Sequence, residues 1–143
     1  MSTETATIRV RHLGGDRLGI QVRGHELFAD QPVEDGGEDT APTPTELFIA
    51  SLAGCVAFYA ERFMRRHHLP TNGLAVTCSF AWAREPARVG EIEVKIEAPD
   101  LPADRFQAFS RVIEHCPIHN TLRQPPDVRF TLVAATTKSA AST

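Results

Sequence analysis

Cysteine is scarce in this sequence of 143 residues, which contains Cys55, Cys78 and Cys116 and no other thiol. Three thiols are too few for the disulfide framework of a small secreted domain, although they can supply one redox pair with one thiol left over. The sequence also lacks a CxxC pair and an HExxH motif, two strong signals for a metal site. We therefore expect no metal and no other cofactor, with a zinc site at Cys55, Cys116 and His119 as the weaker alternative.

Positive charge and long apolar runs are also in short supply. Lys and Arg number 15 against 18 Asp and Glu, so the net charge is −3, which argues against a nucleic-acid partner. We find no apolar run long enough to span a bilayer, and the start MSTETATIRV has neither the basic residues nor the apolar stretch of a signal peptide. We expect a cytoplasmic protein that does not contact membranes.

The length and the 42% hydrophobic content are ordinary for one soluble domain with a real core. Without an internal repeat or a linker, the chain is predicted to form one α+β domain over 1–143. Its core is expected over about 7–134, with 135–143 as a frayed tail.

Alternating apolar residues predict three groups of strands. The first is a meander starting at 7–13, with turns at Gly14-Gly15 and Gly24-His25. The second is a pair at 74–82 and 91–98, in which Leu74, Val76, Cys78, Phe80 and Trp82 share one face. The third is a final strand at 127–133. Residues 31–43 are rich in Pro, Gly and acidic side chains, and we expect a solvated loop of a length that is often functional.

A long helix is predicted from Pro44 to about residue 68. Thr43 and Glu46 have the spacing of a capping box, with proline at the first helical position. Gly54 is unfavourable inside a helix by about 1 kcal/mol relative to alanine, which suggests a close contact. Such a helix is long for so small a domain, so we expect it to pack against another chain. Its predicted apolar stripe consists of Phe48, Leu52, Cys55, Val56, Tyr59 and Phe63.

Two shorter helices are predicted further along the chain. The first covers 102–115, and a second begins at Pro117 with Cys116 as its N-cap. The apolar face of the first is expected to hold Phe106, Phe109, Val112 and Ile113.

The three cysteines differ in their local setting. Cys78 lies on the inward face of a strand and is expected to be a small core residue. Cys116 would meet the positive end of a helix dipole and free N–H groups, which favour a thiolate, with His115 and His119 nearby. By periodicity alone Cys55 is a core residue, and spacing gives no indication that it pairs with Cys116.

The segments PTPTELFIASLAGC around Cys55, CPIHNTL around Cys116 and GHELFADQP before the loop resemble the OsmC/Ohr family, the osmotically inducible and organic hydroperoxide resistance proteins. The resemblance covers about 7–134. It implies an intertwined homodimer in which antiparallel sheets surround long central helices. It also implies that Cys55 is a peroxidatic thiolate that attacks an organic or lipid hydroperoxide and becomes a sulfenic acid. Cys116 would then form a disulfide with it, and a dithiol such as a lipoyl group would reduce that disulfide.

Two supporting groups of the family are missing from their usual positions. The family places a glutamate ten residues before the first cysteine, where this chain has Thr45. Glu46 lies about 180° around the helix from Cys55. The family also uses a loop arginine, but residues 31–43 contain none, and Arg17 and Arg23 are the nearest upstream candidates.

The possible supporting residues are therefore Glu46, Arg17, Arg23 and His119. We predict a thiol-dependent peroxidase-like protein acting on organic hydroperoxides in oxidative-stress defence. The alternative is a non-peroxidase dimer that binds a small hydrophobic ligand or senses redox state.

Overall fold

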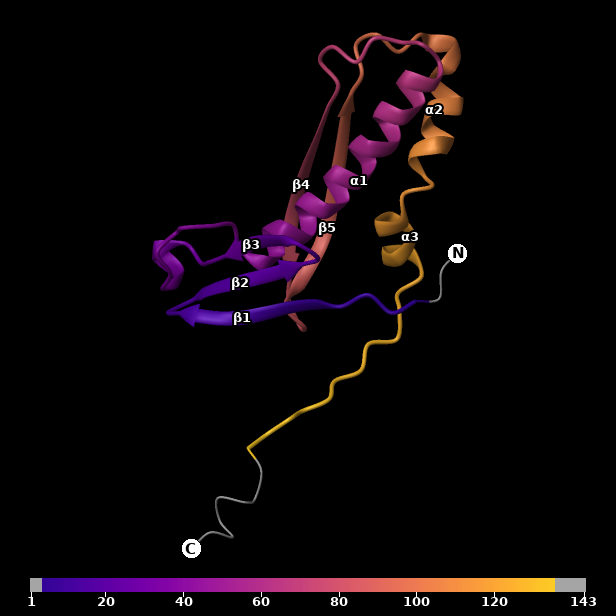
Figure 1. Cartoon of the computed structure of the whole chain (residues 1–143). Coiled ribbons are helices and arrows are strands. Elements are labelled where there is room, and N and C mark those ends of the chain that lie inside the picture. The colour runs from indigo at the N-terminus through magenta and orange to yellow at the C-terminus, as the bar shows by residue number, and fades with distance from the viewer. Residues whose placement is uncertain (1–3, 136–143) are drawn as a thin grey trace, which may run out of the picture.

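The N-terminal part of the chain forms a three-stranded antiparallel meander, as predicted. The computed structural model describes residues 4–135 (Figure 1). Consecutive strands are neighbours, in the order β1-β2-β3. The β1–β2 turn uses Gly14 and Gly15, whose φ angles of 123° and 55° favour glycine. The strands are β1 (Ile8–Gly14), β2 (Arg17–Val22) and β3 (His25–Ala29).

A second sheet is the predicted hairpin of β4 (Ala75–Ala83) and β5 (Arg88–Glu97), which pair antiparallel. Cys78 lies opposite Val94 and is half-buried on the inner face. The prediction is wrong at Trp82, which is 62% exposed. The register shifts between Ala81 and Trp82, and such a bulge redirects the side chains that follow it.

The long helix α1 (Pro44–Arg66) has the predicted N-terminal capping box. The Glu46 backbone N–H donates to Thr43 Oγ1 at 3.1 Å, and the Thr43 N–H donates to Glu46 Oε1 at 2.9 Å. Both donors would otherwise lack a partner at the helix start. Figure 1 shows α1 between the β4–β5 hairpin and the later helices.

The buried stripe of α1 is rotated relative to the predicted one. Phe48 is 40% exposed and Cys55 is only half-buried. The reason is that β4, α2 and α3 cover one side of the helix, while Phe58 stays 48% exposed and Phe48 lies in an open hollow beside Trp82. The buried residues are Ile49, Leu52, Val56, Ala60, Phe63 and Met64.

By length and composition, α1 is also long and apolar enough to cross a bilayer. Its 23 residues contain a window of mean hydropathy 1.4, so the expectation that no such run exists is wrong by this measure. One third of that window is buried against the rest of the chain. The central helix of a soluble protein passes the same test, so the finding carries no argument for a membrane.

The predicted helix at 102–115 is shorter in the structure. A 3₁₀ turn, Ala103–Arg105, precedes α2 (Phe106–Ile113), and α3 (Pro117–Arg123) follows. Phe109 is buried edge-on against Phe63 of α1, with ring centroids 5.3 Å apart. Phe106 is 62% exposed, so the predicted apolar face is only partly buried.

The predicted final strand at 127–133 is wrong. The structure assigns no regular element to residues 124–135, which run away from the helices (Figure 1). A strand needs a neighbouring strand for its backbone hydrogen bonds, and no strand in the described part of the chain pairs with this segment. Its apolar side chains are exposed, including Phe130 at 94% and Leu132 at 91%. The tail predicted at 135–143 falls outside the described residues after position 135.

The loop at 31–43 is held closed by Asp30, which is 1% exposed. Its carboxylate accepts the Gln31 N–H at 2.8 Å, the Thr40 N–H at 3.0 Å and the Thr40 hydroxyl at 2.6 Å. These hydrogen bonds, with the Thr40 hydroxyl first, lower the pKa of Asp30 from 3.8 to about 2. A side chain at Gly37 would collide with the Gln31 carbonyl, so the closed loop also requires glycine there.

We predict that Asp30→Asn destabilises the protein in a pH-dependent way. The folded-state pKa lies below the ordinary value, so the carboxylate stabilises the fold above pH 3.8 and loses this effect as the pH falls toward 2. The difference in unfolding free energy between wild type and Asp30→Asn should be largest near neutral pH and shrink over that interval. Urea denaturation at several pH values measures it. Asp100→Asn, at an exposed position, should stay within about 0.5 kcal/mol of wild type.

Candidate functional site

Cys55 and Cys116 lie together in the fold although they are far apart in the sequence. Cys55 is on α1 and Cys116 is the residue before α3, and the two side chains pack together closely enough for Cys116 to raise the pKa of Cys55. Cys116 is completely buried, whereas Cys55 is half-buried. Both belong to an apolar cluster that includes Leu52 and Val56. Two reactive side chains therefore share one apolar setting.

The N-terminus of α3 places a backbone N–H near each sulfur. The His119 N–H donates to Cys116 Sγ at 3.5 Å, so Cys116 is the N-cap that the sequence predicts. The Ile118 N–H faces Cys55 closely enough to act against the rise in its pKa. Pro117 has no N–H, so these two groups are the first free donors of the helix. One helix end therefore holds both sulfurs.

The environment of Cys55 favours the neutral thiol. Burial is the main cause that raises its pKa, and the neighbouring Cys116 side chain adds to it. The Ile118 N–H acts in the opposite direction without reversing the shift. No cation contributes to the pKa of Cys55 within the described residues. A nucleophilic thiolate here needs a positive group that these contacts do not supply.

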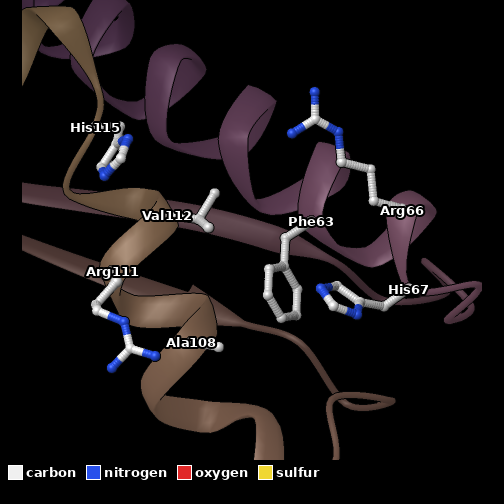
Figure 2. Close-up of a pocket in the computed structure, with 7 residues that line it drawn as sticks. All are labelled: Phe63, Arg66, His67, Ala108, Arg111, Val112 and His115. Atoms are coloured by element: carbon white, nitrogen blue, oxygen red, sulfur yellow. The ribbon is translucent and has the colours of Figure 1, made fainter.

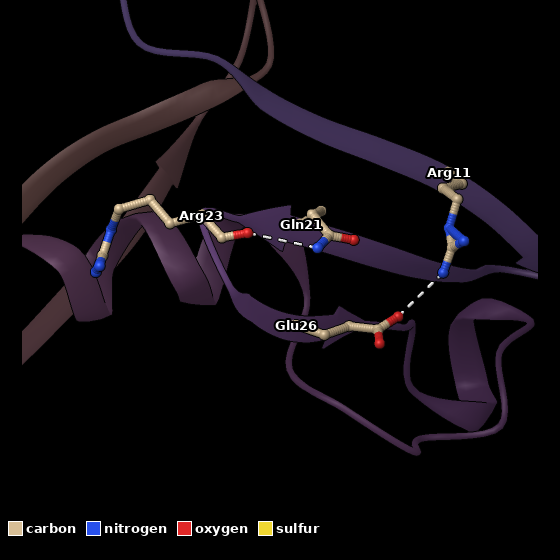
Figure 3. Close-up of polar contacts among 4 residues, drawn as sticks. All are labelled: Arg11, Gln21, Arg23 and Glu26. Atoms are coloured by element: carbon tan, nitrogen blue, oxygen red, sulfur yellow. Dashed lines mark hydrogen bonds and ion pairs between the residues drawn. The ribbon is translucent and has the colours of Figure 1, made fainter.

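The structure does not bring the arginine and glutamate candidates to this sulfur. Glu46 is engaged in the capping box at the start of α1. Arg17 opens β2, and Arg23 lies in the β2–β3 turn, where its carbonyl accepts from Gln21 Nε2 at 3.4 Å (Figure 3). Across the same meander, Arg11 pairs with Glu26 at 3.0 Å.

His119 is the one supporting candidate that the fold places at the site. Its backbone holds Cys116, and its side chain lines a cavity of about 270 Å³ beside the cysteine cluster. The walls are mostly aliphatic and suit an apolar ligand. They consist of Leu52, Val56, Ile92, Val94, Ile96, Ile113, Glu114, His119 and Leu122.

Arg62 is a candidate that the sequence reasoning missed. It follows Cys55 by seven residues, which returns to within about 20° of the same helix face. Its guanidinium lies over the exposed Phe58 ring, 4.6 Å from the centroid. Its Nε is buried with no hydrogen-bond partner in the described part of the chain. The spacing of Cys55, Phe58 and Arg62 was the available signal.

The weaker alternative of a zinc site gains no support. Among residues 4–135, no three His, Cys, Asp or Glu side chains converge as a metal site requires. Cys55 and Cys116 are both free thiols.

The family model for OsmC-like proteins matches residues 36–131, and the chain belongs to this family. No curated protein sequence matches the chain.

Solved structures share its fold. A Psychrobacter arcticus protein, described as a candidate osmotic stress and detoxification response protein, is 24% identical with a TM-score of 0.73, over 84% of this chain and 90% of that one. An OsmC-like protein from Mycoplasma pneumoniae is 18% identical with a TM-score of 0.69, over 87% and 91%. An organic hydroperoxide resistance protein from Legionella pneumophila is 20% identical with a TM-score of 0.62, over 86% and 92%.

We predict that Cys116→Val lowers the pKa of Cys55. Valine fills a similar volume but removes the sulfur that stabilises the protonated thiol. Alkylation of Cys55 at neutral pH should therefore become about two- to tenfold faster, which corresponds to a shift of up to one unit. Mass spectrometry of iodoacetamide-treated protein measures the rate. Cys78, whose pKa is raised by burial alone, is the internal control and should react at an unchanged rate. An unchanged rate at Cys55 would show that Cys116 does not restrain its proton.

Proposed function

We propose that this protein is a thiol-dependent peroxidase that reduces organic hydroperoxides with Cys55 and Cys116. The observation that carries the proposal is the contact between the two thiols at the N-terminus of α3. A peroxidase of this type needs a second sulfur within reach of the first. Membership of the OsmC-like family is consistent with the proposal, since several proteins of similar fold are named for hydroperoxide resistance.

The proposed reduction of the hydroperoxide has three steps. The Cys55 thiolate attacks one oxygen of the hydroperoxide, the O–O bond breaks, and the alkoxide leaves and takes up a proton as the alcohol. Cys55 is then a sulfenic acid. The Cys116 sulfur displaces water from this sulfenic acid and forms a disulfide. A dithiol, for which a lipoyl-type group is our candidate, reduces that disulfide and becomes a cyclic disulfide itself. We place these reactions in the cytoplasm, where such dithiols are kept reduced.

The cavity beside the cysteines fits the organic part of the substrate. Its aliphatic walls would bury an alkyl or aryl group, and this burial favours an organic hydroperoxide over hydrogen peroxide. His119 stands where the apolar walls meet the end of α3.

Arg62 is our candidate for the positive charge that Cys55 needs. The seven-residue spacing puts it on the same face of α1 as Cys55, and its buried Nε has no hydrogen-bond partner in the described residues. A cation near the sulfur would offset the burial that raises the pKa of Cys55.

We also propose that the working form is an intertwined homodimer. Large apolar side chains are exposed in the described part of the chain. The uncovered apolar surface includes Phe58 on α1 and the segment at 128–133. A side chain at Gly54 would meet nothing within 4 Å in this chain, so its own packing does not require glycine there. A second copy crossing α1 closely at Gly54 accounts for that residue.

We predict that one equivalent of cumene hydroperoxide removes two free thiols from the reduced protein within seconds. Peptide mapping after alkylation should place the loss at Cys55 and Cys116, and hydrogen peroxide should react more slowly. Survival of all three thiols for minutes would overturn the proposal. Cys78→Ser is the matched control and should leave the reaction unchanged. Cys116→Ser should stop at the sulfenic acid of Cys55, which dimedone traps.

The same assay tests the role of Arg62. Arg62→Gln should slow oxidation of Cys55 about tenfold or more at neutral pH, and the difference should shrink as the pH rises because the thiol then ionises without help. Arg65→Gln, a neighbour on α1 that pairs with Glu61 at 3.4 Å, should behave as wild type.

We predict that the protein sediments at twice 15.7 kDa and that Gly54→Leu shifts it to a single-chain species. Leucine adds volume where the chain itself has space, so the variant should keep its own fold and lose only the contact with the second copy. Analytical ultracentrifugation measures the change. Ala103→Leu, which adds the same bulk at another exposed site, should stay dimeric. A wild-type protein that sediments as one chain would exclude the dimer.

A second candidate function is the binding of a small apolar ligand without catalysis. The raised pKa of Cys55 and the aliphatic cavity favour it, because a neutral thiol is a suitable wall for such a ligand. The thiol assay separates the two functions, since a pure binding protein keeps its thiols.

A further inference from the structure

A second cavity of about 390 Å³ lies between α1 and α2, on residues that the peroxidase proposal does not use. Its floor is formed by Phe63, Ala108 and Val112 (Figure 2). This volume is within the range of small-molecule sites, about 300–1,000 Å³. The floor is apolar and open, so it is available to the hydrocarbon part of a ligand.

The rim of this cavity carries only basic groups. Arg66 and His67 come from the C-terminal end of α1. Arg111 comes from α2, and His115 lies two residues after the end of that helix. Figure 2 shows the two imidazole rings near opposite ends of the floor, with the guanidinium groups at its outer edges. Within residues 4–135, no acidic side chain lines the cavity.

These charges have no counter-ion in the described part of the chain. Neither Arg66 nor Arg111 takes part in an ion pair there, although Arg65, which precedes Arg66, pairs with Glu61. Arg105 adds a further positive group, since its Nη1 contacts Nδ1 of His67. The protein as a whole is acidic, with a net charge of −3, so this basic cluster is a local feature.

Helix-end electrostatics alone do not explain the arrangement. Basic residues are common in the last turn of a helix because they interact with its negative end. That effect accounts for the residue types of Arg66 and Arg111 separately. It does not account for two helix ends that place them on opposite sides of one uncovered apolar floor.

We infer that this cavity binds an amphiphilic carboxylate, namely a medium-chain fatty acid. The hydrocarbon chain would lie on the floor of Phe63, Ala108 and Val112, and the carboxylate would pair with a rim guanidinium, which matches it in charge and shape. The site is separate from the cysteine pair. The backbone still connects this cavity to the cysteine pair, because His115 on its rim directly precedes Cys116. Occupation of the cavity would therefore hold α2 against α1 beside the buried thiol.

The test is a calorimetric titration of the full-length protein with decanoate below the concentration at which it forms micelles. We expect saturable binding to wild type, and weaker binding of uncharged decanol and of acetate. Arg66→Gln and Arg111→Gln remove charge but keep the floor, and at least one of them should weaken decanoate binding about three- to tenfold. Ala108→Trp, which fills the floor, should abolish it. Arg65→Gln is the matched control and should bind as wild type.

Three results would overturn the inference. The first is equal decanoate binding by wild type and all variants, which indicates adsorption. The second is an NMR shift map centred on Ile92 and Val94, which would place the ligand in the cavity beside the cysteines. The third is that wild type does not bind decanoate and that Arg66→Gln or Arg111→Gln loses the dimer. That result would show that a second copy of the chain occupies the cavity. Cys55→Ser should bind decanoate as wild type does, so the result does not depend on peroxidase activity.

Discussion

The need to cover α1 on all sides is the constraint on which the rest of this structure depends. The helix is apolar around much of its circumference, but the chain's own β4, α2 and α3 bury only the side that carries Leu52, Val56 and Phe63. Phe48 and Phe58 are left facing outward. The meander lies at the lower end of α1, where that helix begins, and the segment at 124–135 runs away from the helices (Figure 1). A single copy therefore leaves one side of α1 and the segment at 124–135 exposed, and a second copy would cover both.

The site follows from where α3 begins. Pro117 starts a short helix beside the buried side of α1, and the first free N–H groups of that helix hold the two sulfurs. This arrangement brings the thiols together in an apolar cluster but keeps Cys55 protonated, because burial outweighs the opposing effect of one backbone N–H. Position and reactivity are thus set by different parts of the molecule. The fold supplies the position. In the peroxidase that we propose, reactivity requires a cation near the sulfur, and Arg62 is our candidate.

Features that depend on nearby residues could be predicted from the sequence. The Thr43–Glu46 capping box, the meander turns, the β4–β5 pair and the N-cap role of Cys116 all involve groups within a few positions of one another. Features that depend on which other parts of the protein cover a surface could not be predicted from the sequence. Half of the predicted stripe of α1, namely Leu52, Val56 and Phe63, is buried, whereas Phe48, Cys55 and Tyr59 are not. The predicted final strand has no strand to pair with in the described part of the chain. The contact of Cys55 with Cys116 was implied by the family resemblance, since spacing alone cannot bring distant helices together.

The use of Cys116 as a helix cap gives its sulfur two duties. As a thiol it accepts the His119 N–H and so closes the first turn of α3. If the same sulfur bonds covalently to Cys55, its lone pairs point in new directions, and the hydrogen bond from the His119 N–H has to adjust. Two other hydrogen bonds still hold the first turn of α3: the Asn120 N–H donates to the Cys116 carbonyl at 3.0 Å, and the Thr121 hydroxyl donates to the Pro117 carbonyl at 2.8 Å. In the peroxidase that we propose, the disulfide would therefore change the cap of α3 without unwinding the helix.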